Sequence, residues 1–376
     1  AQCLVGSEMC IRDRYNMIKN IFTVVMLIAS FVSVSAQQTK ILTAEKHNEY
    51  GLIYTLPITA LDVEVTAVKE TLKAGPYYQY AKKYMGTDKV VRNDAEIWTI
   101  KSVKVRPYGI PDPDSRYLMQ LKPGSATYIG VDADGMLLSI NKTPELPSEE
   151  EPAVEGFEGE KIGDNEYLQY VDEDFIASQS SAKQAQMLAE NLMEIRDAKI
   201  SLTRGTAETM PTDGKQLELM LNSLAHQEAT LTAAFLGNIT KETVIRNFTF
   251  VPDENGKKTL FRLSNFNGFV GADDYSGDPV YISVDITNRG ALPVDSKGEE
   301  KKLPKDAVVY SVPGAAEITI SFLGKTLWQQ ELEFSQFGVV FGLNPSVFSD
   351  KKEPSYAVFD PATGALKEIG AVREEE

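Results

Sequence analysis

Hydrophobic and polar positions alternate with a period of two over much of the chain. Between residues 61 and 67 every second side chain is apolar, and the same alternation returns at residues 280–286. Other β-rich runs lie at residues 96–105, 117–121, 128–131, 136–140, 248–251, 259–263, 308–312, 317–323, 327–334 and 356–359. A period of two is typical of strands with one buried face and one wetter face. The chain is therefore predicted to be mostly β.

A helical period replaces this alternation over a long stretch in the middle of the sequence. Apolar side chains recur at helical spacing from Ser181, where Ser181 and Gln184 form a capping box, to Gly205. A second helix is predicted to start near Asp213 and to stop at Gly237. Because the connection between them is short, we expect the two helices to pair as an antiparallel hairpin.

These patterns predict an α+β fold, mostly β, with two β-rich, sandwich-like domains and an antiparallel helical hairpin between them. Residues 144–166 combine prolines with many glutamates and cannot bury a face, so they are interpreted as an exposed acidic linker. The expected division is an N-terminal β-rich domain at 37–143, the linker at 144–166, the hairpin at 167–240 and a C-terminal β-sandwich-like domain at 241–376.

Two short strings echo each other across the helical region. Ile53-Tyr54-Thr55-Leu56-Pro57 resembles Val309-Tyr310-Ser311-Val312-Pro313, and both β regions close with an Asp-to-Gly turn, at residues 132–135 and 360–364. The echo gives the hypothesis that the two β regions arose by duplication, which requires that they superpose. The alternative is chance, since such turns recur in unrelated proteins.

The N-terminal stretch has the pattern of a targeting segment. Residues 17–36 begin with Met17, carry Lys19 before an apolar run, and end with small residues up to Ala36, as in a cleavable signal peptide. The run is too short and too interrupted for a membrane-spanning helix. Residues 1–16 resemble translated sequencing-adapter read-through and are interpreted as a non-native leader. We expect the mature protein in the periplasm or outside the cell.

The amino-acid composition excludes several kinds of functional site. Both cysteines, Cys3 and Cys10, lie in the leader, so residues 37–376 cannot form disulfides, cysteine-ligated metal sites or a cysteine nucleophile. The formal net charge is −16, and no cluster of lysine and arginine reverses it locally. Nucleic acid is therefore not an expected partner. No transmembrane segment is expected in the mature chain.

No sequence motif assigns a catalytic residue. The two histidines, His47 and His226, have neither metal-binding spacing nor a serine motif beside them, and a solvent-facing or interhelical polar role is favoured for His226. Nucleophile-elbow and phosphate-loop motifs are also absent from the sequence. The enzymatic alternative is a carboxylate-dependent glycan hydrolase, which needs two carboxylates that converge across a cleft.

Two clusters are candidate binding sites. Asp273, Asp274 and Asp278 lie in a glycine-bounded loop whose oxygens could bind calcium, and a plain loop is the alternative. No other cofactor is expected.

A short helix predicted over residues 75–86 would place tyrosines on one face, where they could stack on a sugar or a peptide. Packing of these aromatic rings against a sheet is the alternative. The tyrosines are Tyr77, Tyr80 and Tyr84.

Several strings together resemble the Domain of Unknown Function 4831 family. They are residues 75–86, Arg196-Asp197-Ala198-Lys199 up to Gly205, Met210-Pro211, Asp213-Gly214 and Gln336-Phe337-Gly338-Val339-Val340. The resemblance implies an exported bacterial protein without an established activity. We therefore favour an exported, non-enzymatic binding or structural protein of the bacterial cell envelope, with a protein or a glycan as partner. A further hypothesis is that the hairpin, residues 181–235, is a docking arm.

Overall fold

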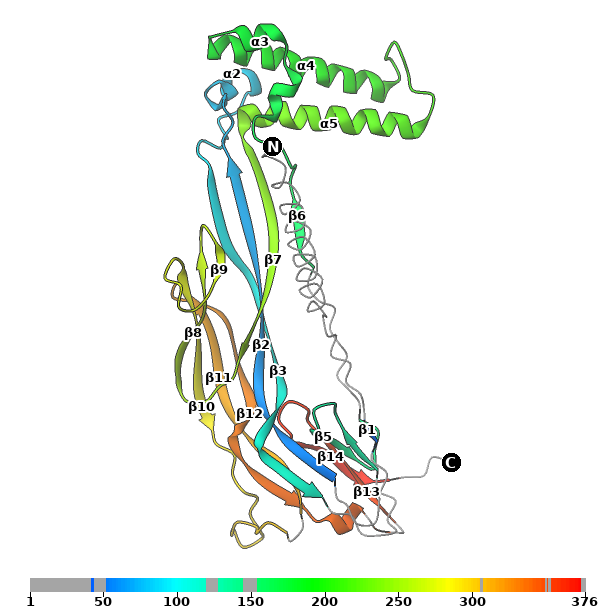
Figure 1. Cartoon of the computed structure of the whole chain (residues 1–376), viewed down its shortest axis with the longest axis vertical. Coiled ribbons are helices and arrows are strands. Elements are labelled where there is room, and N and C mark those ends of the chain that lie inside the picture. Colours follow the sequence, from blue (N-terminus) through cyan, green and yellow to red (C-terminus); the bar gives the residue numbers. More distant parts are fainter. Residues whose placement is uncertain are drawn as a thin grey trace, which may run out of the picture.

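The computed structural model describes residues 42–43, 52–119, 128–144, 154–304, 307–348, 350 and 353–372. The predicted leader, the predicted signal peptide, His47 and most of the linker's prolines lie outside these residues. The molecule is elongated, with long strands along its axis and the larger helices gathered at one end (Figure 1).

Most of the described elements are strands, which range from 2 to 25 residues in length, and the longer helices form one insertion between β6 and β7. The strands are β1 (Leu42–Thr43), β2 (Leu52–Lys73), β3 (Ala95–Met119), β4 (Ile129–Val131), β5 (Leu137–Ile140), β6 (Gly156–Glu158), β7 (Asn238–Phe250), β8 (Gly256–Ser264), β9 (Gly268–Val270), β10 (Asp278–Asn288), β11 (Val308–Phe322), β12 (Lys325–Leu343), β13 (Ser355–Phe359) and β14 (Leu366–Ala371). The helices are η1 (Tyr78–Tyr80), α2 (Ala81–Met85), η2 (Glu166–Tyr170), α3 (Glu173–Ala177), α4 (Ser181–Arg204), α5 (Gly214–Leu236) and η3 (Pro345–Phe348), where η marks a 3₁₀ helix.

The strands form antiparallel sheets with the orders β3-β2-β7-β6, β12-β11-β10-β8-β9 and β1-β4-β5-β13-β14. The fold class is confirmed: the protein is mostly β, with several antiparallel sheets and a helical pair. Some strands predicted as separate are continuous in the structure. The prolines inside them do not end the strand, because they lie at irregular points of the ladder. Pro313 lies at a register shift inside β11, and Pro57 borders one inside β2. A bulge tolerates proline because it needs no ladder N–H there.

The sandwich core combines strands from both predicted β domains. Leu61 and Val63 of β2 are fully buried in one cluster with Ile282 of β10 and Ile318 of β11. In the third sheet β5 pairs directly with β13 through Ala357 and its partner on β5. The predicted boundaries at residues 143 and 241 therefore do not separate the sheets, because long-range pairing joins strands on either side of the helical insertion.

Helices α4 and α5 form the predicted hairpin and project crosswise from the end of the β framework (Figure 1). The N-cap of α4 is Ser180, whose hydroxyl accepts from the Lys183 amide, so the cap lies one residue before the predicted Ser181. The helix ends as predicted at Gly205, which has a left-handed backbone with φ 70°.

Across the hairpin, the Glu228 carboxylate contacts a guanidinium and an ammonium on α4. The partners are Arg196 at 2.8 Å and Lys199 at 3.0 Å.

Within the part of the chain that the structure describes, the hairpin is anchored at its root. Its root carries the fully buried side chains of Leu188, Leu192, Leu231 and Phe235, which pack with α2, η2 and α3 in a core of their own. Apolar burial of this kind, rather than helix propensity, holds an amphipathic helix in place. Within the described residues, no helix combines the length and apolar character that crossing a membrane requires.

Candidate functional site

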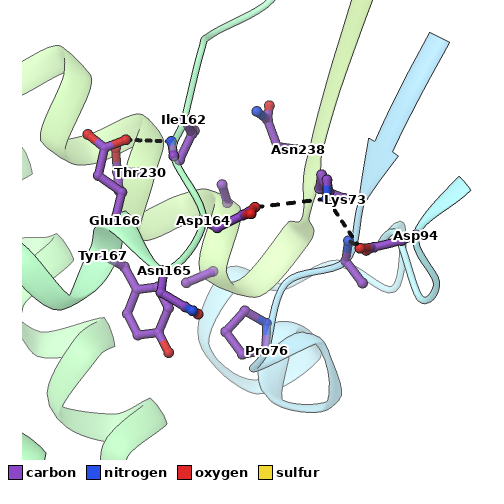
Figure 2. A pocket seen from close by; sticks show the side chains of 14 residues that line it. Lys73, Pro76, Asp94, Ile162, Asp164, Asn165, Glu166, Tyr167, Thr230 and Asn238 are labelled. Atoms are coloured by element: carbon purple, nitrogen blue, oxygen red, sulfur yellow. Dashed lines mark hydrogen bonds and ion pairs between the residues drawn. The ribbon is translucent and has the colours of Figure 1, made fainter. Parts of the chain in front are cut away.

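A polar pocket lies where the root of the hairpin meets the long strands. Its volume is about 340 Å³, close to the lower end of the range of roughly 300–1,000 Å³ for small-molecule sites. Three stretches of chain supply its walls (Figure 2). They are the end of β2 with the loops on both sides of η1 and α2, the stretch from Ile162 to Tyr167, and the end of α5 with the start of β7. The lining residues used below are Lys73, Asp94, Asp164, Asn165, Glu166, Tyr167, Thr230 and Asn238.

Strand pairing and close backbone packing bring these stretches together. Lys73, the last residue of β2, is the ladder partner of Asn238, the first residue of β7. Gly75 lies so close to α5 that a Cβ atom built on it would be 2.5 Å from the carbonyl oxygens of Ala233 and Ala234. Only glycine permits this approach. The amide of Tyr77 then donates to the Ala234 carbonyl over 2.9 Å, which fixes the loop against the helix end.

A single ammonium group joins two carboxylates across the pocket. The Nζ atom of Lys73 lies 3.6 Å from an oxygen of Asp94 and 3.9 Å from an oxygen of Asp164. Figure 2 draws these contacts, with the Asp164 side chain extended toward Lys73. Asp94 also accepts the Ala74 amide at 2.7 Å. Both carboxylates are exposed and already paired.

His226 on α5 contacts two carboxylates, Glu160 and Glu166, of the stretch that forms one wall of the pocket, and we call this three-residue contact the clasp. Its Nδ1 atom lies 2.7 Å from Glu160 Oε1, and its Nε2 atom lies 2.6 Å from Glu166 Oε1. The hydrogen bond with Glu160, followed by that with Glu166, raises the pKa of His226. The Gly163 amide, which donates to Glu166 over 2.6 Å, and then His226 lower the pKa of the Glu166 carboxyl. His226 thus pairs with carboxylates outside the α4–α5 hairpin, and the non-catalytic role favoured for it stays a prediction.

The stretch predicted as an acidic linker is mostly exposed from residue 154 onward, whereas Pro144 at its start is buried, and the stretch is attached to the strands. Within it, β6 pairs with β7 as an edge strand. The side-chain Nδ2 of Asn238 also donates to the Glu160 carbonyl over 2.9 Å. Sequence reasoning missed this attachment, because three residues of strand give almost no periodic signal. It also missed Lys73, Asp94 and Thr230 as residues of one site, since only tertiary pairing brings them together.

The predicted tyrosine site lies beside the pocket, in the core at the hairpin root. Tyr77 is buried, and its ring lies 6.1 Å from that of Phe235, while its hydroxyl donates to Gln184. The Tyr80 hydroxyl is 3.0 Å from Ser181 Oγ, and the Tyr84 ring is 6.0 Å from Phe235. These contacts are those of packing residues. A role for the three tyrosines in binding a ligand stays a prediction.

The predicted calcium loop is held by a side chain from a neighbouring strand. The Arg262 guanidinium donates to the carbonyl oxygens of Ala272 and Gly277 at 2.8 Å and 3.2 Å, and lies over the ring of Tyr275. The Ser276 amide donates to Asp274 and lowers the pKa of that carboxyl. Asp273, Asp274 and Asp278 do not form a metal-binding group, and no other set of three histidine, cysteine or acidic side chains in the described ranges does. Calcium binding stays a prediction.

The comparisons with known proteins give a family and no activity. The family model described as Domain of unknown function (DUF4831) matches residues 50–367. The searches of curated proteins and of solved structures return no match to this chain.

Proposed function

The chain belongs to the DUF4831 family, and on that premise we propose that it is an exported, non-enzymatic binding or structural protein of the bacterial cell envelope. We further propose that the α4–α5 hairpin is its docking arm and that the arm binds a protein with an apolar surface. The export part of the proposal is supported by the leader pattern at residues 17–36.

The proposal that the hairpin is a docking arm rests on the contrast between its two ends. Leu231 and Phe235 at the root are fully buried. The outer part keeps Leu202 buried but exposes other large apolar side chains: Leu219 is 64% exposed and Ile200 is 43% exposed. Met210 in the connection and Met220 on α5 are exposed as well. Single exposed apolar residues are ordinary, but four on one projecting end are typical of an interaction surface. Methionines suit such a surface because their flexible thioethers adapt to a partner's shape.

The structure does not favour the hydrolase alternative, because the three carboxylates that line the pocket, Asp94, Asp164 and Glu166, are each already paired with Lys73 or His226. Its mechanism needs two carboxyl groups facing each other in one cleft. Among the described residues the buried acidic side chains are Glu64 and Asp132. Glu64 lies 3.5 Å from the Lys104 ammonium, and Asp132 accepts amides of its own turn, those of Asp134 and Met136. The alternative stays a prediction.

Site-specific photo-crosslinking tests the arm directly. A photo-reactive side chain at Leu219 of the full chain, expressed in its host, should trap a protein that mass spectrometry identifies. The matched control carries the same group at Phe266, which is more exposed but lies in the turn between β8 and β9. The trapped protein is then purified, and its affinity is measured for wild type, for Leu219→Asp with Met220→Asp, and for Phe266→Asp.

We expect the double variant to lose at least about tenfold in affinity, because it puts charge where apolar contact forms. Phe266→Asp should bind as wild type does. Equal affinities for all three proteins would refute the docking arm. Export is tested separately by N-terminal sequencing of the envelope fraction, where we expect the product to begin at Gln37. A leader still attached to a cytosolic product would refute export.

A further inference from the structure

The pocket beside the hairpin root has more carboxylates than cations in its lining, and each carboxylate is already paired with a cation of the protein. Lys73 lies between Asp94 and Asp164, and Glu166 is paired with His226. A cationic ligand would have to displace these internal cations. An anionic ligand would meet three carboxylates against one lysine. Both charged classes are therefore disfavoured, and the lining suits a neutral ligand with many hydrogen-bonding groups.

A buried hydroxyl in the lining has no partner. Thr230 on α5 is 1% exposed, and its Oγ1 atom makes no hydrogen bond within the described part of the chain. Buried polar side chains are rarely left unpaired, because burial removes their hydrogen bonds with water. A ligand hydroxyl in the pocket would satisfy Thr230 as donor, as acceptor or as both.

A second lining residue has an unusual backbone. Asn165 adopts a left-handed conformation with φ 54°, which asparagine tolerates better than most side chains do. It immediately precedes η2, but its side chain does not cap that helix. In Figure 2 its amide group extends toward Pro76. An amide that supplies both donors and an acceptor, in a lining that also holds the apolar ring of Pro76, matches the alternating hydroxyl and C–H surface of a sugar.

We propose that this pocket binds a neutral polyhydroxylated ligand, one saccharide unit in size. The Thr230 hydroxyl and the Asn165 amide make the direct hydrogen bonds. Asp94, Asp164 and Glu166, each already paired with Lys73 or His226, accept further ligand hydroxyls, and Tyr167 and Pro76 supply apolar contact. The site is separate from the exposed end of the docking arm, so it goes beyond the proposed function and does not depend on it.

Saturation-transfer NMR and calorimetry on the full mature chain test this site. The neutral probes are glucose, galactose and N-acetylglucosamine, with glucosamine as the matched cation and glucuronate as the matched anion. We expect saturable binding of at least one neutral sugar, and weaker binding of the two charged sugars. A charged sugar that binds more tightly than every neutral one, or no saturable binding by any neutral probe, would overturn the proposal.

Variants locate the binding within the molecule. Thr230→Val keeps the side-chain shape and removes only the hydroxyl, so it should fold and should bind the neutral sugar about tenfold more weakly. Asn165→Gly keeps the left-handed backbone, removes the amide and should weaken binding similarly. Thr232→Val is the matched control, since Thr232 lies on the same helix outside this lining. Unchanged binding by both pocket variants would overturn the assignment, and partner capture by the arm should be the same in all three.

Discussion

The hydroxyl of Tyr54 makes two hydrogen bonds with Val309, a residue 255 positions further along the chain. It donates to the Val309 carbonyl over 3.0 Å and accepts the Val309 amide over 2.7 Å. Burial raises the pKa of the Tyr54 phenol, so the group stays protonated and able to donate. The contact joins β2 to β11 inside the core and connects the two strings that echo each other in the sequence.

Tyr54→Phe should lower the free energy of unfolding by about 2 kcal/mol, because it leaves buried backbone groups of Val309 without their partner. Equilibrium unfolding in urea measures the loss. Tyr117→Phe is the matched control, since that ring lies 5.8 Å from the Tyr54 ring and is only partly buried. It should change stability by less than about 0.5 kcal/mol. Equal losses in both variants would contradict this role of the Tyr54 hydroxyl.

The echoed strings make the same contact with the turn that closes each β region. The amide of Thr55 donates to the Gly135 carbonyl over 3.0 Å, and the amide of Ser311 donates to the Gly364 carbonyl, also over 3.0 Å. Each of these strand residues also forms a parallel bridge with the residue after that glycine. Such repeated local geometry agrees with the duplication hypothesis. Superposition of the complete regions is still its test.

The two turn glycines differ in one respect that a pair of substitutions can separate. Both have positive φ, 81° at Gly135 and 68° at Gly364. A Cβ atom at Gly135 would meet nothing within 4 Å, whereas one at Gly364 would lie 2.7 Å from Pro57 Cδ. Gly135→Ala should therefore cost only the left-handed backbone term, roughly 1 kcal/mol.

Gly364→Ala should cost that backbone term and about 1–3 kcal/mol more for overpacking against Pro57. Urea unfolding of the two variants in parallel measures the difference, and Gly135→Ala serves as the control for backbone strain alone. A smaller loss for Gly364→Ala than for Gly135→Ala would show that the contact with Pro57 relaxes freely.

The sequence predicted those parts of the fold that depend on local spacing. The hairpin was predictable because residues 181–205 and 213–237 carry both the 3.6-residue period and glycine stop signals. The pairing of β2 with β7 and of β5 with β13 was not, because antiparallel partners more than a hundred residues apart leave no periodic trace in either strand. For this reason the sheets cross the predicted domain boundaries.

The pocket was beyond the sequence for a related physical reason. Asn238 follows the glycine that ends the second predicted helix, and the acids near residue 160 belong to the stretch predicted as exposed. Their common location depends on the ladder that places Lys73 opposite Asn238 and on the close approach of Gly75 to α5. Gly75 is the local sequence feature that could have indicated the pocket, because a glycine permits another segment of backbone to approach closely.

Arg262 gives a prediction for the loop of residues 271–278. Because the guanidinium donates to two loop carbonyls, Arg262→Ala should destabilise the protein by about 2 kcal/mol and increase amide hydrogen exchange in the loop. If the loop is a plain loop, which is the alternative to a calcium site, saturating calcium leaves the melting temperature of both proteins unchanged. A melting temperature that rises with calcium in wild type, and not in Asp274→Asn, would instead establish the predicted calcium site.

The clasp between His226, Glu160 and Glu166 should make stability depend on pH in a defined window. The pKa of His226 is raised from its ordinary value of 6.5, so its contribution is fully present below pH 6.5 and is lost as the pH rises through the raised value. The pKa of Glu166 is lowered from 4.5, so its contribution is present above pH 4.5 and is lost as the pH falls through the lowered value. The clasp is therefore strongest between pH 4.5 and 6.5.

His226→Gln should remove the upper limit of this window. Glutamine keeps a polar side chain but cannot become a cation, so the variant should lose stability relative to wild type near pH 5.5 and converge with it at alkaline pH. The difference should stay below about 1 kcal/mol, because the pair is partly exposed and screened by solvent. Urea unfolding across the pH range measures it, and hydrogen exchange at residues 160–167 reports whether the pocket wall loosens at the same time. Glu194→Gln, a change on the neighbouring helix α4, is the control for altered net charge. If the difference between His226→Gln and wild type were the same at every pH, a titrating clasp would be excluded.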